Sequence, residues 1–179
     1  MKKKISIILV LAFTIGLIPG VALARLVACV GDSITYGTGI SNRNYNSYPA
    51  QLAGFLQEVD NKWETQNFGV SGATLLKKTN KPYVEESLYK RALASEPEVV
   101  IVQLGSNDSA HVSISQIEQD FIPDYLALID AFEQLRSHPK IFVCCPPPIF
   151  GGNYGNNNTI KDVIIPLVQQ LPENLLPFW

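Results

Sequence analysis

A serine at position 33 is the first side chain in this sequence whose type and surroundings suit covalent chemistry. It stands in VACVGDSITYGTG (27–39), where an apolar run ends in Gly31-Asp32-Ser33. Three roles are open to it. A Gly-Asp-Ser sequence suits a turn, and a glycine-rich loop that opens a helix can bind a phosphate through backbone N–H groups. A serine hydroxyl can also act as a nucleophile when a base accepts its proton.

Two later loops carry groups that a serine nucleophile needs. Gly72, in NFGVSGAT (67–74), offers an unhindered backbone N–H, and Asn107, in LGSNDS (104–109), offers a side-chain amide. Preorganised N–H donors stabilise the oxyanion that develops during acyl transfer, by about 3 kcal/mol each. A serine combined with two such donors favours the nucleophile role.

The phosphate-binding role fits the loop 31–39 less well. The loop matches neither G-x-G-x-x-G nor G-x-x-x-x-G-K-[ST], and the carboxylate of Asp32 would repel a phosphate. Gly37 and Gly39 are therefore interpreted as loop residues.

These three groups need a scaffold that brings their loops together. Apolar runs typical of buried strands alternate with helical patterns along the chain. The expected strands are 26–30, 63–68, 98–104 and 140–145, and the expected helices are 47–59, 85–95, 116–136 and 160–171. This alternation predicts a parallel sheet with helices on both faces, and ligands bind such sheets at the carboxyl ends of the strands. All three candidate residues follow such ends.

The three blocks together resemble those of the GDSL or SGNH hydrolases. Gly31-Asp32-Ser33 is similar to the first block of that family, Gly72 to the second and Gly105-x-Asn107-Asp108 to the third. The resemblance implies a flavodoxin-like three-layer α/β/α sandwich with strand order 2-1-3-4-5. It also implies Ser33 as the nucleophile, and an oxyanion hole made by the N–H groups of Ser33 and Gly72 and the side chain of Asn107.

A finer similarity concerns the substrate. GDSITYGTG, NSYPAQL, NFGVSGATLLKK and the three prolines 146–148 resemble exported sialate or carbohydrate O-acetylesterases. This implies a carbohydrate ester as substrate, with no metal and no organic cofactor. Three alternatives stay open: a lysophospholipase or thioesterase of the same superfamily, a non-catalytic carbohydrate-binding relative, and a flavodoxin-like nucleotide or flavin binder.

The base that such a serine requires is not evident. The family carries it in a D-x-x-H motif near the C-terminus, and the two histidines here, His111 and His138, stand in no such motif. His138 precedes the fourth expected strand, at the far end of the sheet, whereas His111 follows the third strand and is a candidate substitute. We therefore expect the 25–179 domain to be C-terminally incomplete. Its fifth strand and catalytic histidine would be missing, and its activity weak or absent.

The first 24 residues have the features of a secretory signal peptide. MKKK is basic, ISIILVLAFTIGLI is apolar, and Ala22-Leu23-Ala24 provides a cleavage site. We expect export to the periplasm or the exterior, without a stable membrane anchor after cleavage. Two alternatives are an uncleaved membrane anchor and a lipoprotein box at LVAC (26–29), in which Cys29 would be the lipidated residue. Arg25 interrupts the apolar run before that box, which speaks against lipidation.

The net charge and the cysteine content limit which binding partners and metal sites are expected. Removing residues 1–24 takes three of 14 basic residues and none of 16 acidic ones, which leaves a net charge of about −5. Nucleic acid is therefore not an expected partner.

The three cysteines, Cys29, Cys144 and Cys145, show no metal-binding spacing. We interpret them as buried free thiols, and a disulfide bridge from Cys29 to Cys144 or to Cys145 is left open. Oligomeric state is not indicated.

Overall fold

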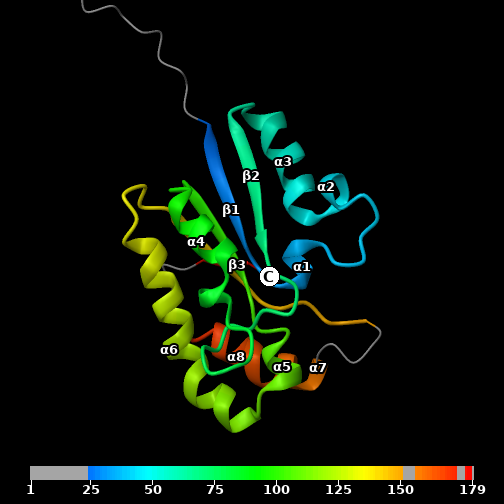
Figure 1. The fold of residues 1–179 in the computed structure, drawn as a ribbon, viewed down its shortest axis with the longest axis vertical. Coiled ribbons are helices and arrows are strands. Elements are labelled where there is room, and N and C mark those ends of the chain that lie inside the picture. Colours follow the sequence, from blue (N-terminus) through cyan, green and yellow to red (C-terminus); the bar gives the residue numbers. More distant parts are fainter. Residues whose placement is uncertain (1–23, 151–155, 173–175, 179) are drawn as a thin grey trace, which may run out of the picture.

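A parallel sheet of five strands forms the centre of the described structure (Figure 1). The structure is a computed structural model that describes residues 24–150, 156–172 and 176–178. The strand order is β2-β1-β3-β4-β5, and all neighbouring strands are parallel. The strands are β1 (Arg25–Gly31), β2 (Trp63–Gly69), β3 (Val99–Gln103), β4 (Lys140–Cys144) and β5 (Leu176–Phe178). The order confirms the flavodoxin-like arrangement. The expected signal peptide falls almost wholly outside the described residues.

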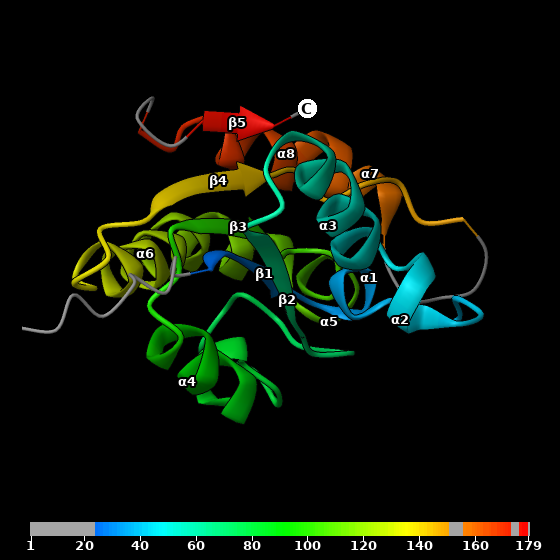
Figure 2. The same cartoon turned by 90° about the horizontal axis from the view of Figure 1, so that it is seen from above.

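The helices lie on both sides of this sheet. Figure 2 shows α3 and α4 on opposite faces. The longer helices are α3 (Tyr48–Val59), α4 (Ser87–Ala94) and α6 (Ile114–Glu133). The short ones are α1 (Ser33–Tyr36), α2 (Arg43–Asn46), the 3₁₀ turn η1 (Tyr83–Glu85), α5 (Asp108–His111), α7 (Asn157–Thr159), the π-helical η2 (Ile160–Ile164) and α8 (Ile165–Val168). The three-layer prediction is therefore confirmed.

One face of the sheet forms the main core. Because successive strand residues point to opposite faces, this face carries the even residues of β1 and β3 and the odd residues of β4. They pack with apolar side chains of α4, α6, η2 and α8 into one buried cluster. Phe121, Tyr125 and Phe132 of α6 are fully buried in it, whereas Pro123, in the middle of that helix, is exposed.

The opposite face is only partly covered. Val27 and Cys29 of β1 are buried, but Val99, Ile101 and Cys144, on β3 and β4, are half-buried. These strands and the apolar side of α3 border a groove of about 830 Å³. The sheet is thus sealed on one face and open beside α3 on the other.

The fifth strand is the main correction to the sequence-based expectation. We expected it to be missing, but Leu176–Phe178 pairs with β4, with Pro177 opposite Val143. A proline is tolerated at this position because β5 is an edge strand, whose outer N–H groups join no ladder. A strand of three residues with a central proline forms no apolar or alternating run, so the sequence pattern does not predict it.

The last helical segment also differs from its expected form. The pattern predicts one helix over 160–171, and the structure has α7, η2 and α8 in succession from residue 157 to 168. Pro166 lies in the first turn of α8, directly after the π-helical turn. Because η2 and α8 form one continuous helical run, Pro166 removes a main-chain donor from it, and the π-helical turn lies directly before this proline.

Candidate functional site

Ser33 lies at the carboxyl end of the central strand β1. It begins α1, and Asp32 occupies the N-cap position, where its Oδ1 accepts a hydrogen bond from Ile34 N at 2.9 Å. Gly37 ends this helix with a left-handed φ of 87°, which glycine adopts without strain. The loop role expected for Gly37 is thereby confirmed, and the short helix holds Ser33 half-buried at the edge of the sheet.

The Gly72 segment follows β2 and lies beside the Ser33 segment. Val70 N donates to Gly31 O at 2.9 Å, and the hydroxyls of Thr38 and Ser71 lie 2.6 Å apart. Gly72 is exposed and has a φ of 80°, a region that favours glycine. The two segments therefore meet through one main-chain and one side-chain hydrogen bond, which leaves Gly72 at the surface.

Asn107 approaches the same segment from the end of β3. Its Nδ2 donates to Ala73 O at 2.8 Å, one residue beyond Gly72. The side chain is buried, with 7% of its surface exposed. The structure thus brings Asn107 next to the Gly72 segment, as the sequence predicts from their positions at the carboxyl ends of two strands, β2 and β3, which lie on either side of β1.

Three N–H groups at this edge have no partner among the described residues. They are the backbone N–H groups of Ser33 and Gly72 and the second hydrogen of the Asn107 amide; only its first is used, by Ala73 O. The N–H of Ser33 is free because the first residues of a helix have no acceptor one turn earlier. Unpaired N–H groups at one sheet edge are what an oxyanion requires. The catalytic roles of Ser33, Gly72 and Asn107 stay predictions.

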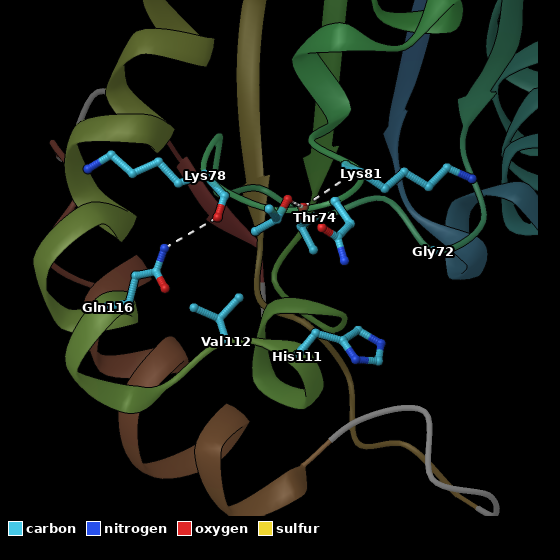
Figure 3. Close-up of a pocket in the computed structure, with 9 residues that line it drawn as sticks. Gly72, Thr74, Lys78, Lys81, His111, Val112 and Gln116 are labelled. Atoms are coloured by element: carbon cyan, nitrogen blue, oxygen red, sulfur yellow. Dashed lines mark hydrogen bonds between the residues drawn. The ribbon is translucent and has the colours of Figure 1, made fainter.

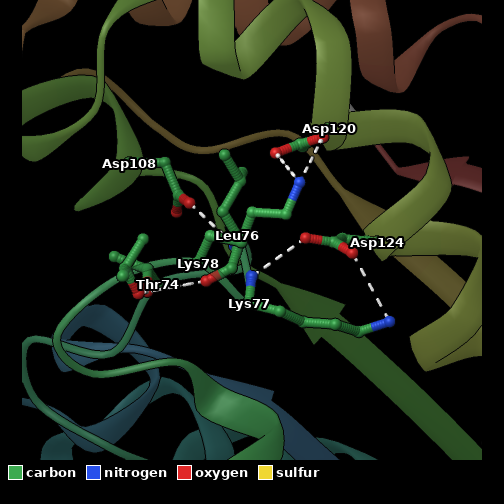
Figure 4. A network of polar contacts seen from close by, with 8 residues as sticks. Thr74, Leu76, Lys77, Lys78, Asp108, Asp120 and Asp124 are labelled. Atoms are coloured by element: carbon green, nitrogen blue, oxygen red, sulfur yellow. Dashed lines mark hydrogen bonds and ion pairs between the residues drawn. The ribbon is translucent and has the colours of Figure 1, made fainter.

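Asp108 fixes the loop that follows Gly72. Its carboxylate is fully buried and accepts hydrogen bonds from Leu75 N and Leu76 N, each at 2.9 Å. Figure 4 shows this contact beside the pairs that link Lys77 to Asp124 and Lys78 to Asp120 of α6. Sequence reasoning gave Asp108 no role. Its place directly after Asn107 in the third block was the available signal.

Burial controls the electrostatics of the two acidic residues at this edge. It raises the pKa of Asp32 from 3.8 to about 6, partly opposed by the hydrogen bond from Ile34 N and by nearby Ser106, while Asp108 adds repulsion. Asp32 Oδ2 and Ser106 Oγ do not reach hydrogen-bond geometry and have no partner among the described residues. Burial also raises the pKa of Asp108, although the Leu76 and Leu75 N–H groups favour its ionised form.

A pocket of about 490 Å³ opens beside Gly72 (Figure 3). Its lining is polar apart from Val112 and includes Asn80, Lys81, His111 and Gln116. In Figure 3 the side chains of Lys81 and His111 extend in the same direction, toward the Gly72 segment. The pocket therefore places hydrogen-bonding groups next to one of the candidate oxyanion donors.

The two histidines lie at opposite ends of the sheet. His111 ends α5 and is exposed at the pocket, on the same side as Gly72. His138 is exposed just before β4 begins at Lys140, on the far side. The placement predicted for each is confirmed, and whether His111 acts as a base stays a prediction.

The cysteines are free thiols, as interpreted from the sequence, but only Cys29 is buried as expected, and Cys144 and Cys145 are half-buried. Burial raises the pKa of Cys29 to about 12 and that of Cys144 to about 11. Cys29 lies in the middle of β1 with none of its surface exposed, an environment that does not suit a lipidated terminus.

Two further properties of the described ranges concern metal binding and membrane crossing. In this part of the chain, no group of three or more His, Cys, Asp or Glu side chains is arranged to hold a metal ion. Nor does any helix there combine the length and apolar character needed to cross a bilayer.

Comparison with known proteins places the chain in a family. Residues 29–173 match the GDSL-like Lipase/Acylhydrolase family. The chain belongs to this family. The match spans the segments of Ser33, Gly72 and Asn107 together, and it confirms the resemblance inferred from those three blocks.

Individual relatives agree with this GDSL-like assignment. An acetylxylan esterase of Xylanibacter ruminicola is 38% identical over 163 residues, which cover 81% of this chain and 33% of the relative. The chain therefore spans about a third of that protein's length. The crystal structure of AlinE4, an SGNH-hydrolase family esterase, is 26% identical with a TM-score of 0.55, over 82% of this chain and 71% of AlinE4.

The fold itself is shared with a further structure. The lipase/acylhydrolase from Enterococcus faecalis has a TM-score of 0.62 at 20% identity, over 86% of this chain and 74% of that one. This likeness confirms the α/β fold predicted from the alternating pattern.

Proposed function

We propose that this GDSL-like protein is an exported serine esterase that removes O-acetyl groups from carbohydrate. Ser33 Oγ attacks the ester carbonyl carbon and forms an acyl-enzyme, and the sugar alcohol leaves with a proton. Water then attacks the same carbon and releases acetate and Ser33. The basic, apolar and small-residue features of residues 1–24 support export.

The observation that carries the proposal is the set of unpaired N–H groups around the Ser33 segment. Within the described residues, the N–H groups of Ser33 and Gly72 and one hydrogen of the Asn107 amide have no acceptor. Each attack on the ester carbonyl turns its oxygen into an oxyanion, which needs such donors. A flavin or phosphate binder does not explain the buried amide of Asn107 held against Ala73 O.

The polar pocket supports a sugar as the alcohol. Asn80, His111 and Gln116 can exchange hydrogen bonds with sugar hydroxyls, and they line the same pocket as Gly72. The relative that is 38% identical is an acetylxylan esterase, which also supports an acetylated carbohydrate as the substrate.

The proton of the Ser33 hydroxyl needs an acceptor, and His111 is the candidate general base. It lines the same pocket as Gly72, whereas His138 lies at the opposite end of the sheet. A general base must come within about 3 Å of the hydroxyl, directly or through one water. If His111 serves, His111→Gln lowers kcat strongly and His138→Gln does not.

The test is release of acetate from acetylated xylo-oligosaccharides and from p-nitrophenyl acetate by the protein. We expect slow turnover, because neither histidine of this sequence stands in a D-x-x-H motif near the C-terminus, where the family carries it. Ser33→Ala should abolish this turnover, and mass spectra of the quenched reaction should contain an acetylated Ser33 peptide. Turnover that persists unchanged in Ser33→Ala contradicts the proposal. Sugar binding without any acyl-enzyme would favour the non-catalytic carbohydrate-binding alternative.

A second candidate is an esterase for long acyl chains, and one observation favours it. The groove of about 830 Å³ beside α3 is lined mostly by apolar side chains and includes Ile40, in the segment that follows α1. Rates with p-nitrophenyl esters from acetate to dodecanoate separate the two candidates. An O-acetylesterase loses activity as the acyl chain grows, whereas a lysophospholipase or thioesterase gains it.

A further inference from the structure

The side chain of Lys81 makes an unusual contact behind the Gly72 segment. Its ammonium donates a hydrogen bond to Ser71 O at 2.8 Å. Within the described part of the chain, no carboxylate lies within ion-pair distance of Lys81, although Lys77 pairs with Asp124 and Lys78 with Asp120. Of the three lysines in this loop, Lys81 is thus the one whose charge is directed at a main-chain carbonyl.

That carbonyl belongs to the same peptide unit as the N–H of Gly72. A trans peptide is planar, and its C=O and N–H point in opposite directions. A group that fixes the Ser71 carbonyl therefore also fixes the direction of the Gly72 N–H, on the other side of the peptide plane. A cation on the oxygen also draws electron density from the nitrogen, which makes the N–H a stronger donor, because linked hydrogen bonds polarise one another.

The peptide unit needs such a support. Gly72 is exposed, and its φ of 80° is one that glycine enters and leaves freely. A Cβ added at Gly72 would meet nothing closer than Lys81 Cδ, at 3.9 Å. The hydrogen bond from Ala73 N to Val70 O, at 3.1 Å, closes the turn around this peptide but does not contact the Ser71–Gly72 peptide at its centre. The side chain that does contact it is that of Lys81.

The loop that carries Lys81 is held independently of its side chain. Thr74 N donates to Lys81 O at 3.0 Å, and Thr74 Oγ1 does so at 3.1 Å. A change of the Lys81 side chain keeps both hydrogen bonds. Its effect on Gly72 can thus be separated from an effect on folding.

We propose that Lys81 is a positioning residue of the oxyanion site, which holds the Ser71–Gly72 peptide so that the Gly72 N–H faces the reacting carbonyl oxygen. The inference rests on the proposed serine-esterase function. Lys81 itself stays behind the peptide and acts through it. Two peptides further along the chain, the side-chain amide of Asn107 holds another main-chain carbonyl, Ala73 O.

Kinetics of Lys81→Met and Lys81→Arg test this role on p-nitrophenyl acetate. Removal of an oxyanion donor lowers kcat by 10²–10³, so we expect loss of its support to lower kcat about tenfold, with KM little changed and with Lys81→Arg restoring most of the rate. Lys77→Met is the matched control, because it removes the same charge from the same loop and should keep full activity. A rise in KM at constant kcat would overturn the proposal, since it would make Lys81 a substrate-binding group.

A second readout does not depend on turnover. The ¹H and ¹⁵N resonances of the Gly72 amide should move upfield in Lys81→Met and return in Lys81→Arg, while Lys77→Met leaves them in place. An unmoved Gly72 signal in Lys81→Met overturns the inference. If the unaltered protein shows no Ser33-dependent turnover, the proposed function fails instead, and the two failures are thereby distinguished.

Discussion

The change Asp32→Asn should alter how the free energy of unfolding depends on pH. Asp32 has none of its surface exposed, and burial raises its pKa from 3.8 to about 6. Well below pH 4 the carboxyl is protonated in both the folded and the unfolded chain. Between pH 4 and 6 the unfolded chain loses this proton while the folded one keeps it, so stability falls as the pH rises.

The size of the effect follows from the two pKa values. Each pKa unit corresponds to about 1.4 kcal/mol, so ionised Asp32 costs the folded protein about 3 kcal/mol at pH 8. Asparagine carries no such cost. Its Oδ1 can still accept from Ile34 N, and its amide can donate to Ser106 Oγ, which has no partner among the described residues.

The assay is urea unfolding at pH 4 and pH 8, followed by tryptophan fluorescence. We expect the stability difference between Asp32→Asn and the unaltered protein to be about 2–3 kcal/mol larger at pH 8 than at pH 4. Asp130→Asn, on the exposed side of α6, controls for the loss of one negative charge. Parallel pH dependences for Asp32→Asn and the unaltered protein would refute the reasoning, because they would mean that burial does not hold the proton on Asp32.

Two further changes test the loops around the site. Asp108→Ala leaves the N–H groups of Leu75 and Leu76 buried without an acceptor and should lower the free energy of unfolding by about 2–4 kcal/mol in urea titrations, since each such group costs about 1–3 kcal/mol. Gly69→Ala places a Cβ against the backbone of α1 and should lower both the yield of folded protein and the Ser33-dependent activity. Gly54→Ala, in open space on α3, is its control and should raise stability by about 0.5–1 kcal/mol in the same titrations; equal effects of the two would contradict the steric argument.

Most of the fold could be predicted from local patterns. The first four strands stand within one or two residues of their expected bounds, because each is a short apolar or alternating run between turn residues. The order of β1 to β4 followed from the resemblance to the GDSL or SGNH hydrolases, whereas β5 was expected to be missing and is present. The short helices α1, α2 and α5 were not predicted, since four residues carry no periodicity that a sequence can reveal.

The sequence by itself determined which residues stand at the candidate catalytic edge of the sheet. Ser33, Gly72 and Asn107 each follow a strand, and parallel strands bring their carboxyl ends together whatever else the chain does. Only the tertiary structure decided how these groups are held. Asp108 contacts Leu75 N and Leu76 N, and β5 pairs with β4, across segments that are distant in the sequence. Lys81 contacts Ser71 O within one folded loop. Such contacts depend on where loops meet in space, and no local spacing of residues encodes that meeting.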